Sequence, residues 1–402
     1  DYNSTYDFDN DKIVKILDNE WGDGFNVVPV AYADKGVAPS EDLKYADLII
    51  CTEAMSGGAT LSNGMKQFVG QVPMINLKGY NYTYNSTASK SRWGWGAPAN
   101  PGKDKVAITP SKFGLKVLEG VKFSNDGTVA LYENAGDYNH VQCVNFNENV
   151  PSVNSILGTV DGDNTKVAMH YIKEKNFFGL FLSVDDFTAY TDNAGIIVDN
   201  AAKMLLDGAD LTDAWESARV SAGGFTTFCP IHSGAKIKGF EAYTAKLDAD
   251  NSKVVLIEVP GGDGLEQGKG YIIKGEPGQV CVFHPDDDAY MTTENDLTGL
   301  TADTPLGTGA YVLGVKDNKC FFGPWEAGIM PAVKAYLDID ELAGAGAAPR
   351  LEIVFDDEST AIASVASSAA KADSKAYNLA GQTVADSYKG IVIKDGKKVT
   401  RK

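Results

Sequence analysis

Residues 72–79 read V-P-M-I-N-L-K-G. This apolar run begins near a proline and ends at a glycine, which is typical of a buried parallel strand that leads into a sharp turn. In many α/β enzymes the nucleophile sits on such a strand-to-helix elbow. Leu77 holds that position here, and a leucine side chain has neither a lone pair nor an ionisable proton. The stretch therefore predicts an α/β enzyme scaffold that lacks its nucleophile.

Helices and short apolar strands alternate on both sides of this stretch. We expect helices at 11–19, 64–70 and 194–206, and strands at 25–33, 43–51 and 72–77. This alternation is typical of βαβ units and a parallel sheet. A doubly wound sheet normally starts with a strand before its first helix. The chain begins with Asp1 and not Met, so we expect that it was processed or trimmed and that an upstream strand was lost.

Five motifs of residues 10–208 follow one another in a recognisable order. They are A-D-L-I-I-C-T-E-A-M-S-G-G, V-P-M-I-N-L-K-G, S-R-W-G-W-G-A-P, F-F-G-L-F-L-S-V-D-D and N-A-A-K-M-L-L. In these motifs the segment resembles class I glutamine amidotransferase-like domains, including the trehalose-utilisation-type proteins. The resemblance implies a flavodoxin-like α/β domain with a parallel sheet at residues 1–212.

The same resemblance indicates which catalytic residues are missing. Active members carry a cysteine on the elbow and, after a late strand, a histidine followed by an acid. Leu77 stands in place of the cysteine, Ser183 stands in place of the histidine, and Asp185 loosely matches the acid. Cysteine catalysis needs a thiolate and its base. We therefore expect a degenerate domain with no catalytic residue, in which Cys51 is a buried thiol.

The carboxyl ends of the parallel strands are the usual ligand site of such a sheet. Residues 79–101, which follow the elbow, are rich in Tyr, Trp, Asn and Ser. Aromatic rings can stack on the C–H faces of sugars, and amide or carboxylate oxygens accept hydrogen bonds from hydroxyls. We expect a saccharide or small polar ligand to bind Glu53, Ser56, Lys78, Tyr80, Trp93, Trp95 and Asp185. The alternative is that Trp93 and Trp95 fill the vacated pocket as core residues.

The second part of the chain has a different pattern. Residues 213–357 show short strands separated by turns and no convincing long helix, which predicts an all-β sandwich-like or barrel domain. Patterns such as F-T-T-F-C-P, G-K-G-Y-I-I-K-G and R-L-E-I-V-F-D-D resemble a β module near the C-termini of secreted Bacteroidetes proteins. The resemblance gives no catalytic residue to carry over.

Residues 358–402 are predicted to be a linker followed by a β tail. The segment 358–374 is rich in Ala and Ser, as linkers are. Residues 377–402 resemble a Bacteroidetes-type C-terminal tail, some of which are sorting signals. The pair Asp395–Gly396 predicts a β-hairpin turn. Two roles stay open: a hairpin that docks on the preceding β module, and a sorting signal.

Composition limits the partners. The chain has 402 residues and a net charge of −18, and such a surface repels nucleic acid. No apolar run approaches the roughly 20 residues of a membrane helix. The five cysteines and four histidines show no metal-ligand spacing. We therefore expect no nucleic acid, no membrane span, no metal and no cofactor, and the sequence does not indicate an oligomeric state.

Two functions of different classes follow. The first is a secreted or cell-surface bacterial protein whose non-catalytic amidotransferase-like domain binds a glycan or another small polar ligand. The second is a hydrolase that uses another constellation at the same sheet edge, with Glu53 or Asp185 as general base. The observation that separates them is whether two titratable groups with perturbed pKa values face one open cleft.

Overall fold

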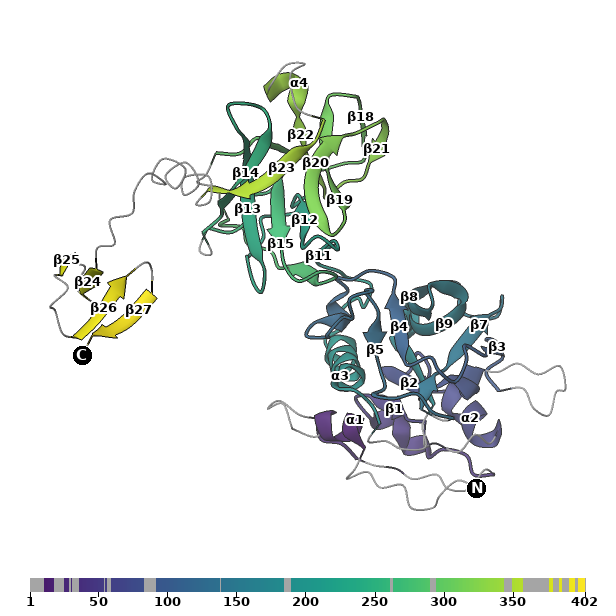
Figure 1. Cartoon of the computed structure of the whole chain (residues 1–402). Coiled ribbons are helices and arrows are strands. Elements are labelled where there is room, and N and C mark those ends of the chain that lie inside the picture. Colours follow the sequence, from purple (N-terminus) through teal and green to yellow (C-terminus); the bar gives the residue numbers. More distant parts are fainter. Residues whose placement is uncertain are drawn as a thin grey trace.

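The computed structural model shows a chain that is mostly β, with few helices (Figure 1). It describes residues 11–17, 25–28, 30, 36–53, 55, 59–82, 92–137, 139–183, 189–260, 263–289, 294–342, 349–356, 376–378, 383–384, 390–394 and 397–401; for residues 183, 341, 342 and 376–401 it describes the backbone alone. Three parts follow one another: a mixed, curled sheet, a sheet that nearly closes into a barrel, and a small C-terminal sheet.

The first sheet is parallel at one edge and antiparallel elsewhere. Strands β1 (Ile49–Cys51), β2 (Met74–Lys78) and β10 (Phe177–Ser183) run parallel, in that order. The antiparallel strands that continue the sheet are β9 (Asp163–Ile172), β8 (Asn154–Val160), β4 (Ala107–Pro110) and β5 (Val129–Ala130), with β3 (Gly96–Ala99), β6 (His140–Val141) and β7 (Cys143–Phe146) attached at the side. A doubly wound flavodoxin-like sheet is therefore not clearly shown.

Several local predictions in this part are wrong. The segment predicted as a strand at 43–51 begins as a 3-10 helix, Glu41–Tyr45, and is a strand only at Ile49–Cys51. The described residues of the predicted strand 25–33 are extended but belong to no strand, and Phe25 and Val27 pack on the core while Val28 is exposed. Pro29 has no N–H to give to a sheet ladder, which is consistent with this result. The helix predicted at 64–70 lies earlier, as α2 (Ala59–Lys66). Only a short helix, α1 (Lys12–Lys15), occupies the first predicted helical segment, where the Asp11 side chain caps it.

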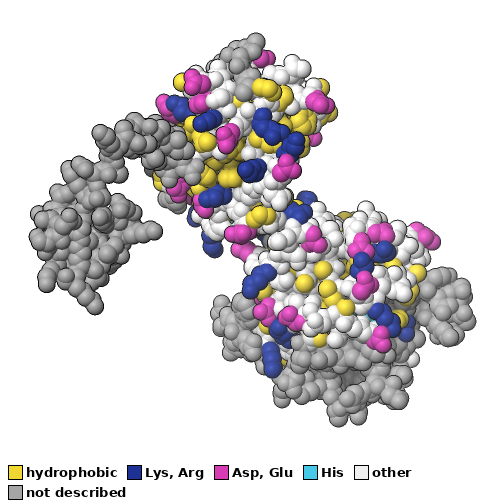
Figure 2. Space-filling view, viewed as in Figure 1, with side chains coloured by type: hydrophobic (Ala, Val, Ile, Leu, Met, Phe, Trp, Pro, Cys, Tyr) yellow, Lys and Arg dark blue, Asp and Glu magenta, His cyan; other side chains and the backbone are white. Residues whose placement is uncertain are grey.

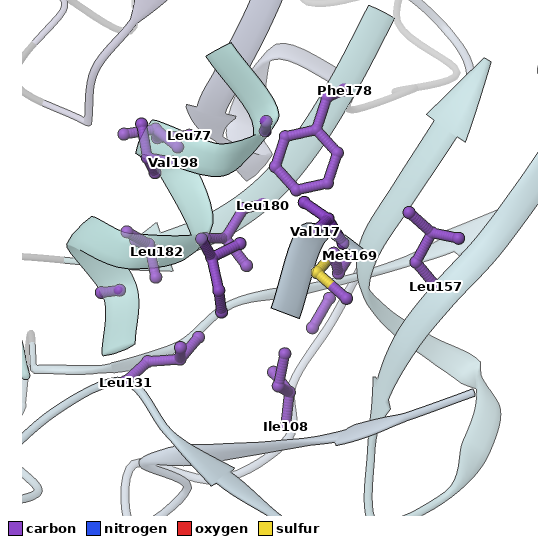
Figure 3. Close-up of a cluster of buried hydrophobic side chains, with 14 of the residues drawn as sticks. Leu77, Ile108, Val117, Leu131, Leu157, Met169, Phe178, Leu180, Leu182 and Val198 are labelled. Atoms are coloured by element: carbon purple, nitrogen blue, oxygen red, sulfur yellow. The ribbon is translucent and has the colours of Figure 1, made fainter. Parts of the chain in front are cut away.

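The helix α3 (Asp192–Leu206) confirms the helix predicted at 194–206. Its buried residues Ala194, Ile197, Val198 and Ala201 follow the helical repeat and form one face. Figure 3 shows this face against the sheet, with Val198 beside Leu77 of β2. None of the helices in the described ranges is long and apolar enough to cross a membrane.

The second part forms a nine-stranded sheet that curls into a near-barrel, as the all-β pattern predicts. All neighbouring strands are antiparallel except β14 and β23. In sheet order they are β12 (Phe225–Phe228), β15 (Tyr271–Lys274), β13 (Glu241–Leu247), β14 (Lys253–Glu258), β23 (Leu351–Phe355), β20 (Lys319–Pro324), β19 (Ala310–Lys316), β22 (Ala335–Asp338) and β17 (Leu297–Gly299). Two contacts bring the two ends of this sheet together. Cys229 N donates a hydrogen bond to Val333 O at 3.0 Å, and Lys269 forms a β-bridge with Thr298 of β17.

Two short ribbons flank the near-barrel. Strand β11 (Glu216–Arg219) pairs with β16 (Val280–Phe283), and β18 (Thr304–Leu306) pairs with β21 (Gly328–Met330). The first ribbon follows the connection from the N-terminal part, where Trp215 N donates to Gly114 O at 2.8 Å. The two parts of the chain are therefore joined by backbone hydrogen bonds as well as by the connecting segment.

The C-terminal part contains the predicted hairpin. Strands β26 (Gly390–Lys394) and β27 (Lys397–Arg401) pair with Lys394 opposite Lys397, so residues 395–396 connect them. Two further strands, β24 (Ala376–Asn378) and β25 (Thr383–Val384), extend the hairpin to four strands in the order β25-β24-β26-β27. A lone two-stranded hairpin is marginal in water, and the two added strands give the tail the strand number that independent stability needs. Docking on the near-barrel stays a prediction.

Candidate functional site

The parallel strands bring Glu53 and Lys78 together. Cys51 at the end of β1 lies opposite Asn76 of β2, so Glu53, two residues further on, comes beside Lys78 at the end of β2. Side chains alternate along β2: Leu77 packs into the core beneath α3, whereas Lys78 belongs to the other face. The position that the sequence assigned to a nucleophile is therefore a core position, and Lys78 is the residue presented at the strand end.

Glu53 and Lys78 form a buried ion pair. Lys78 Nζ lies 3.3 Å from Glu53 Oε1 and donates to the Glu53 carbonyl oxygen at 2.7 Å. The Glu53 side chain is only 8% exposed and the Lys78 side chain only 1%. Burial raises the pKa of Glu53 to about 7, because the loss of hydration outweighs the attraction of Lys78. Glu53 Oε2 is buried and has no hydrogen-bond partner.

Two asparagines extend this polar cluster. Asn76 Nδ2 donates to Lys78 O at 2.9 Å, and Asn81 Nδ2 donates to Asn76 Oδ1 at 2.7 Å. Asn81 lies on the 3-10 turn η4 (Gly79–Tyr82) that follows β2 directly. Its Oδ1 atom is also buried without a partner. The end of β2 thus carries two buried oxygen atoms without a partner: Asn81 Oδ1, which can only accept a hydrogen bond, and Glu53 Oε2, which accepts one when the carboxyl is ionised.

Trp93 and Trp95 belong to the core. Both are buried, and their ring centroids lie 5.1 and 5.3 Å from that of Tyr82. Trp93 Nε1 donates to Ser62 O at 2.6 Å, and Trp93 N and Trp95 N donate to backbone oxygens of η4. This is the core alternative that the sequence left open. Rings buried in this way offer no free face to a sugar.

Tyr80 is an exposed aromatic residue at this edge. Its side chain is 49% exposed, and the Arg92 guanidinium carbon lies 5.9 Å from the ring centroid. Tyr80 sits on η4, two residues after Lys78. Ser56 and Asp185, which the sequence also assigned to the site, lie outside the described residues. Ser183 ends β10 opposite His140, and only its backbone is described.

A buried histidine lies under the aromatic cluster, and the sequence analysis did not find it. His170 of β9 has its Nε2 atom 3.0 Å from Tyr82 Oη and its Nδ1 atom 2.5 Å from Asn154 Oδ1. Because Asn154 Oδ1 can only accept, Nδ1 carries the proton and Tyr82 donates to Nε2. Burial lowers the pKa of His170 to about 3, so the ring is neutral. Both nitrogens are occupied, and His170 is not placed to act as a base.

One sequence signal could have revealed this histidine. Gly179 lies in the middle of the buried strand β10, opposite His170, and a Cβ atom there would come within 2.5 Å of His170 Nε2. A glycine inside an apolar strand often marks the close approach of another group. Here it gives the imidazole the space that it occupies.

The cysteine near the site is not a nucleophile. Cys51 is buried at the end of β1, and burial raises the pKa of its thiol to about 12. The thiolate, which is the reactive form, is therefore scarce at neutral pH. Among the described residues, no group of three His, Cys, Asp or Glu side chains lies close enough to hold a metal ion.

Comparisons with known proteins give little further information. No protein-family model matches the chain, and no curated protein matches it. One solved structure that it resembles is described as a ThuA-like protein from Bacteroides uniformis ATCC 8492. The two are 14% identical with a TM-score of 0.35, over 48% of this chain and 81% of that one. A similarity this low does not establish a shared function.

Proposed function

We propose that the N-terminal part is a degenerate, flavodoxin-like glutamine amidotransferase-like domain that binds a small polar ligand, most simply a saccharide. The site is the carboxyl edge of the parallel strands around Glu53, Lys78 and Tyr80. The observation that carries this proposal is Glu53 Oε2, a buried carboxylate oxygen without a partner at the edge where such sheets bind ligands.

The polarity of the cluster selects the kind of ligand. A buried acceptor that lacks a donor costs about 1–3 kcal/mol, and Glu53 Oε2 and Asn81 Oδ1 both lack one. A hydroxyl group of a ligand would donate to either oxygen. A metal cation fits less well, because the Lys78 ammonium already lies 3.3 Å from the other carboxylate oxygen. A ligand rich in hydroxyl groups is therefore favoured over a cation.

Tyr80 supplies the apolar contact that saccharide binding usually needs. Its ring is half exposed on the turn that follows Lys78, and Arg92 beside it adds hydrogen-bond donors. The C–H face of a sugar can pack on such a ring while its hydroxyls reach the polar cluster. Tyr80 takes over the stacking role that the sequence analysis gave to Trp93 and Trp95.

The alternative is a hydrolase in which Glu53 is the general base. One observation favours it: a carboxyl whose pKa is about 7 is well suited to take up a proton near neutral pH. Against it, a general base must reach the water that attacks the substrate, whereas the Glu53 side chain is only 8% exposed and already pairs with Lys78. The described residues also offer no protein nucleophile at this edge. Cys51 is a buried thiol with a raised pKa, and Leu77 belongs to the core.

A binding experiment with paired variants tests the proposal. A glycan array on the intact chain would select saccharides, and calorimetry would then compare Tyr80→Ala with Tyr45→Ala. Tyr45 is a matched control, because its ring is 77% exposed and has the Lys44 ammonium 5.1 Å from its centroid, but it precedes β1 at the opposite end. We expect Tyr80→Ala to weaken binding about tenfold, which corresponds to about 1.4 kcal/mol, and Tyr45→Ala to leave it unchanged.

Glu53→Gln separates the two functions. In the binding protein it should weaken affinity, since an amide nitrogen can replace the acceptor Oε2. In a hydrolase it should abolish turnover while the substrate still binds. Equal effects of the two tyrosine variants, or no saccharide bound at all, would contradict the proposed site.

We further propose that the protein is exported to the bacterial cell surface or secreted. This rests on the resemblance of residues 377–402 to Bacteroidetes-type tails. Cell fractionation of the full chain and of a variant without residues 377–402 tests it. We expect the full chain outside the cell and the shortened chain retained; the same location for both would show that the tail is no sorting signal.

A further inference from the structure

A histidine lies at the same sheet edge as the proposed ligand site, on the other side of β10. His140 begins β6, which pairs with the last residues of β10, so that His140 is opposite Ser183 and Val141 is opposite Leu182. Strand β2 pairs with the other side of β10, and there Lys78 lies beside Leu182. His140 and Lys78 therefore flank the carboxyl end of β10 from its two sides.

His140 belongs to the face of the sheet on which Lys78 lies. Val141 is buried in the core on the α3 side, and side chains alternate along a strand, so His140 and Gln142 belong to the opposite face. The position of Gln142 supports this assignment, because a Cβ atom on Gly79, directly after Lys78, would lie only 2.7 Å from Gln142 Oε1. The side chains of β6 on this face thus reach the end of β2.

Buried polar atoms without a partner gather around this edge. In the ranges that the structure describes, seven side-chain nitrogen or oxygen atoms are buried and have no hydrogen-bond partner. Four of these atoms lie where β2 and β10 end: Glu53 Oε2, Asn81 Oδ1, Asn139 Oδ1 and His140 Nδ1. Folded proteins leave few buried polar groups unsatisfied. Two pairs of such atoms on the two sides of β10 therefore indicate a ligand that reaches both.

The imidazole of His140 is suited to a hydroxyl group. Its Nδ1 atom is buried without a partner, whereas another part of the residue is exposed. Loss of hydration lowers the pKa of His140, and this effect outweighs that of the Gly136 backbone, which favours the charged ring. The neutral ring has one nitrogen that donates and one that accepts. A hydroxyl group can also do both, so it can bind either nitrogen.

We propose that the site extends from β2 across β10 to His140 and takes a ligand of at least two linked sugar units. This inference rests on the saccharide-binding function proposed above. Neighbouring strands lie about 4.8 Å apart, so β2 and β6 are separated by about 10 Å across β10. One sugar ring is shorter than that span, whereas two linked rings cover it. The first ring packs on Tyr80 with its hydroxyls at Glu53 and Asn81, and a hydroxyl of the second ring binds His140.

Calorimetry with sugars of two lengths tests this extension on the intact chain. The probes are glucose, mannose and N-acetylglucosamine, each compared with its disaccharide, which is cellobiose, mannobiose or chitobiose. His140→Gln and His140→Phe both remove the imidazole, and the second variant keeps an aromatic ring. His232→Gln is the matched control, because His232 is 80% exposed and lies between β12 and β13 of the near-barrel.

The proposal predicts an effect that depends on the length of the sugar. The parent protein should bind the disaccharide more tightly than the monosaccharide. Both His140 variants should bind the disaccharide about fivefold more weakly than the parent, as expected for the loss of one hydrogen bond, and should bind the monosaccharide as the parent does. His232→Gln should change neither affinity. Urea unfolding shows whether each variant is folded, and one folded variant of His140 is enough for the test.

The outcomes separate this extension from the proposed function. If the parent binds none of the sugars, the saccharide site is wrong and the extension fails with it. If Tyr80→Ala weakens binding but the His140 variants bind as the parent does, the binding function stands and the extension is wrong. Equal weakening of both sugar lengths, or the failure of both His140 variants to fold, would show that His140 supports the fold and would also overturn the extension.

Discussion

Replacing Glu53 with glutamine tests the electrostatics of the candidate site most directly. The variant keeps the size of the side chain and an oxygen that accepts from Lys78, but it no longer titrates. In the folded protein burial raises the pKa of Glu53 to about 7, from an ordinary value of 4.5. The folded state therefore keeps a proton on Glu53 over a pH range in which the unfolded chain has lost it.

The sign and size of the effect follow from this difference. The stability that protonated Glu53 contributes is fully present below about pH 4.5 and is lost as the pH rises through about 7. The change in pKa corresponds to about 3 kcal/mol of unfolding free energy. As the pH rises from about 4.5 to about 8, the unfolding free energy of the parent protein should therefore fall by about 3 kcal/mol more than that of the Glu53→Gln variant. Burial lowers the pKa of His170, so this residue makes stability rise with pH instead. His170 is present in both proteins, and its contribution therefore cancels when the two are compared.

The assay must report on the N-terminal part alone, because a chain with several domains does not unfold in one step. Urea titrations at several pH values, read by hydrogen-exchange mass spectrometry of β2 and β10, meet this need. Glu41→Gln is the control: Glu41 is an exposed acid whose carboxylate lies 4.0 Å from Lys44 Nζ, and it should follow the parent at every pH. If the unfolding free energies of Glu53→Gln and the parent change with pH in parallel, the Glu53 carboxyl is not buried in the way that the structure shows.

Four further predictions concern other features of the chain. Cys51, whose thiol pKa burial raises to about 12, should resist iodoacetamide and glutamine-like electrophiles in the native protein and react after unfolding; stoichiometric labelling of the native protein, located by mass spectrometry, would contradict the degenerate site. Burial lowers the pKa of His170 to about 3, so neutral His170 should stabilise the fold fully above about pH 6.5. That contribution, about 5 kcal/mol in total, should be lost as the pH falls through about 3. In acid titration, the unfolding free energy of a His170→Gln variant should fall less steeply than that of the parent. Trp93→Ala should lower the unfolding free energy measured in urea by about 3–5 kcal/mol, as the loss of a buried aromatic side chain does. A loss below about 1 kcal/mol would contradict the core role of Trp93 and favour its role in ligand binding. Trypsin should cut the segment 358–375 before the strands β26 and β27, and equally fast cleavage after Lys394 would show that the four-stranded tail is not folded by itself.

The sequence by itself determined those features that depend on one segment. The apolar spacing of Ala194, Ile197 and Val198 predicted α3, because a helix repeats every 3.6 residues and buries one face. The pattern of short strands and turns after residue 213 predicted an all-β unit, and Asp395–Gly396 predicted the hairpin of β26 and β27. Each of these signals is local, so no partner segment had to be known.

Part of the candidate site was also predictable. Glu53 and Lys78 follow two apolar strands, and parallel strands end at the same edge, so their proximity could be expected. The sequence did not show that the pair is buried, nor that Glu53 Oε2 and Asn81 Oδ1 lack donors. Those facts depend on what the rest of the chain places over the strand ends.

Only the tertiary structure decided which neighbours each segment has. The apolar segment at 25–30 has the composition of a strand, but whether it joins a sheet depends on long-range pairing, and its described residues join none. Trp93 and Trp95 read equally well as a platform or as core, and they are core because Tyr82 and β10 meet them from distant parts of the sequence. His170 became notable only through its contacts with Tyr82 and Asn154, and His140 only through its place opposite Ser183 at the end of β10. Burial and pKa depend on the sum of such contacts, and that sum is a property of the folded chain and not of any single segment.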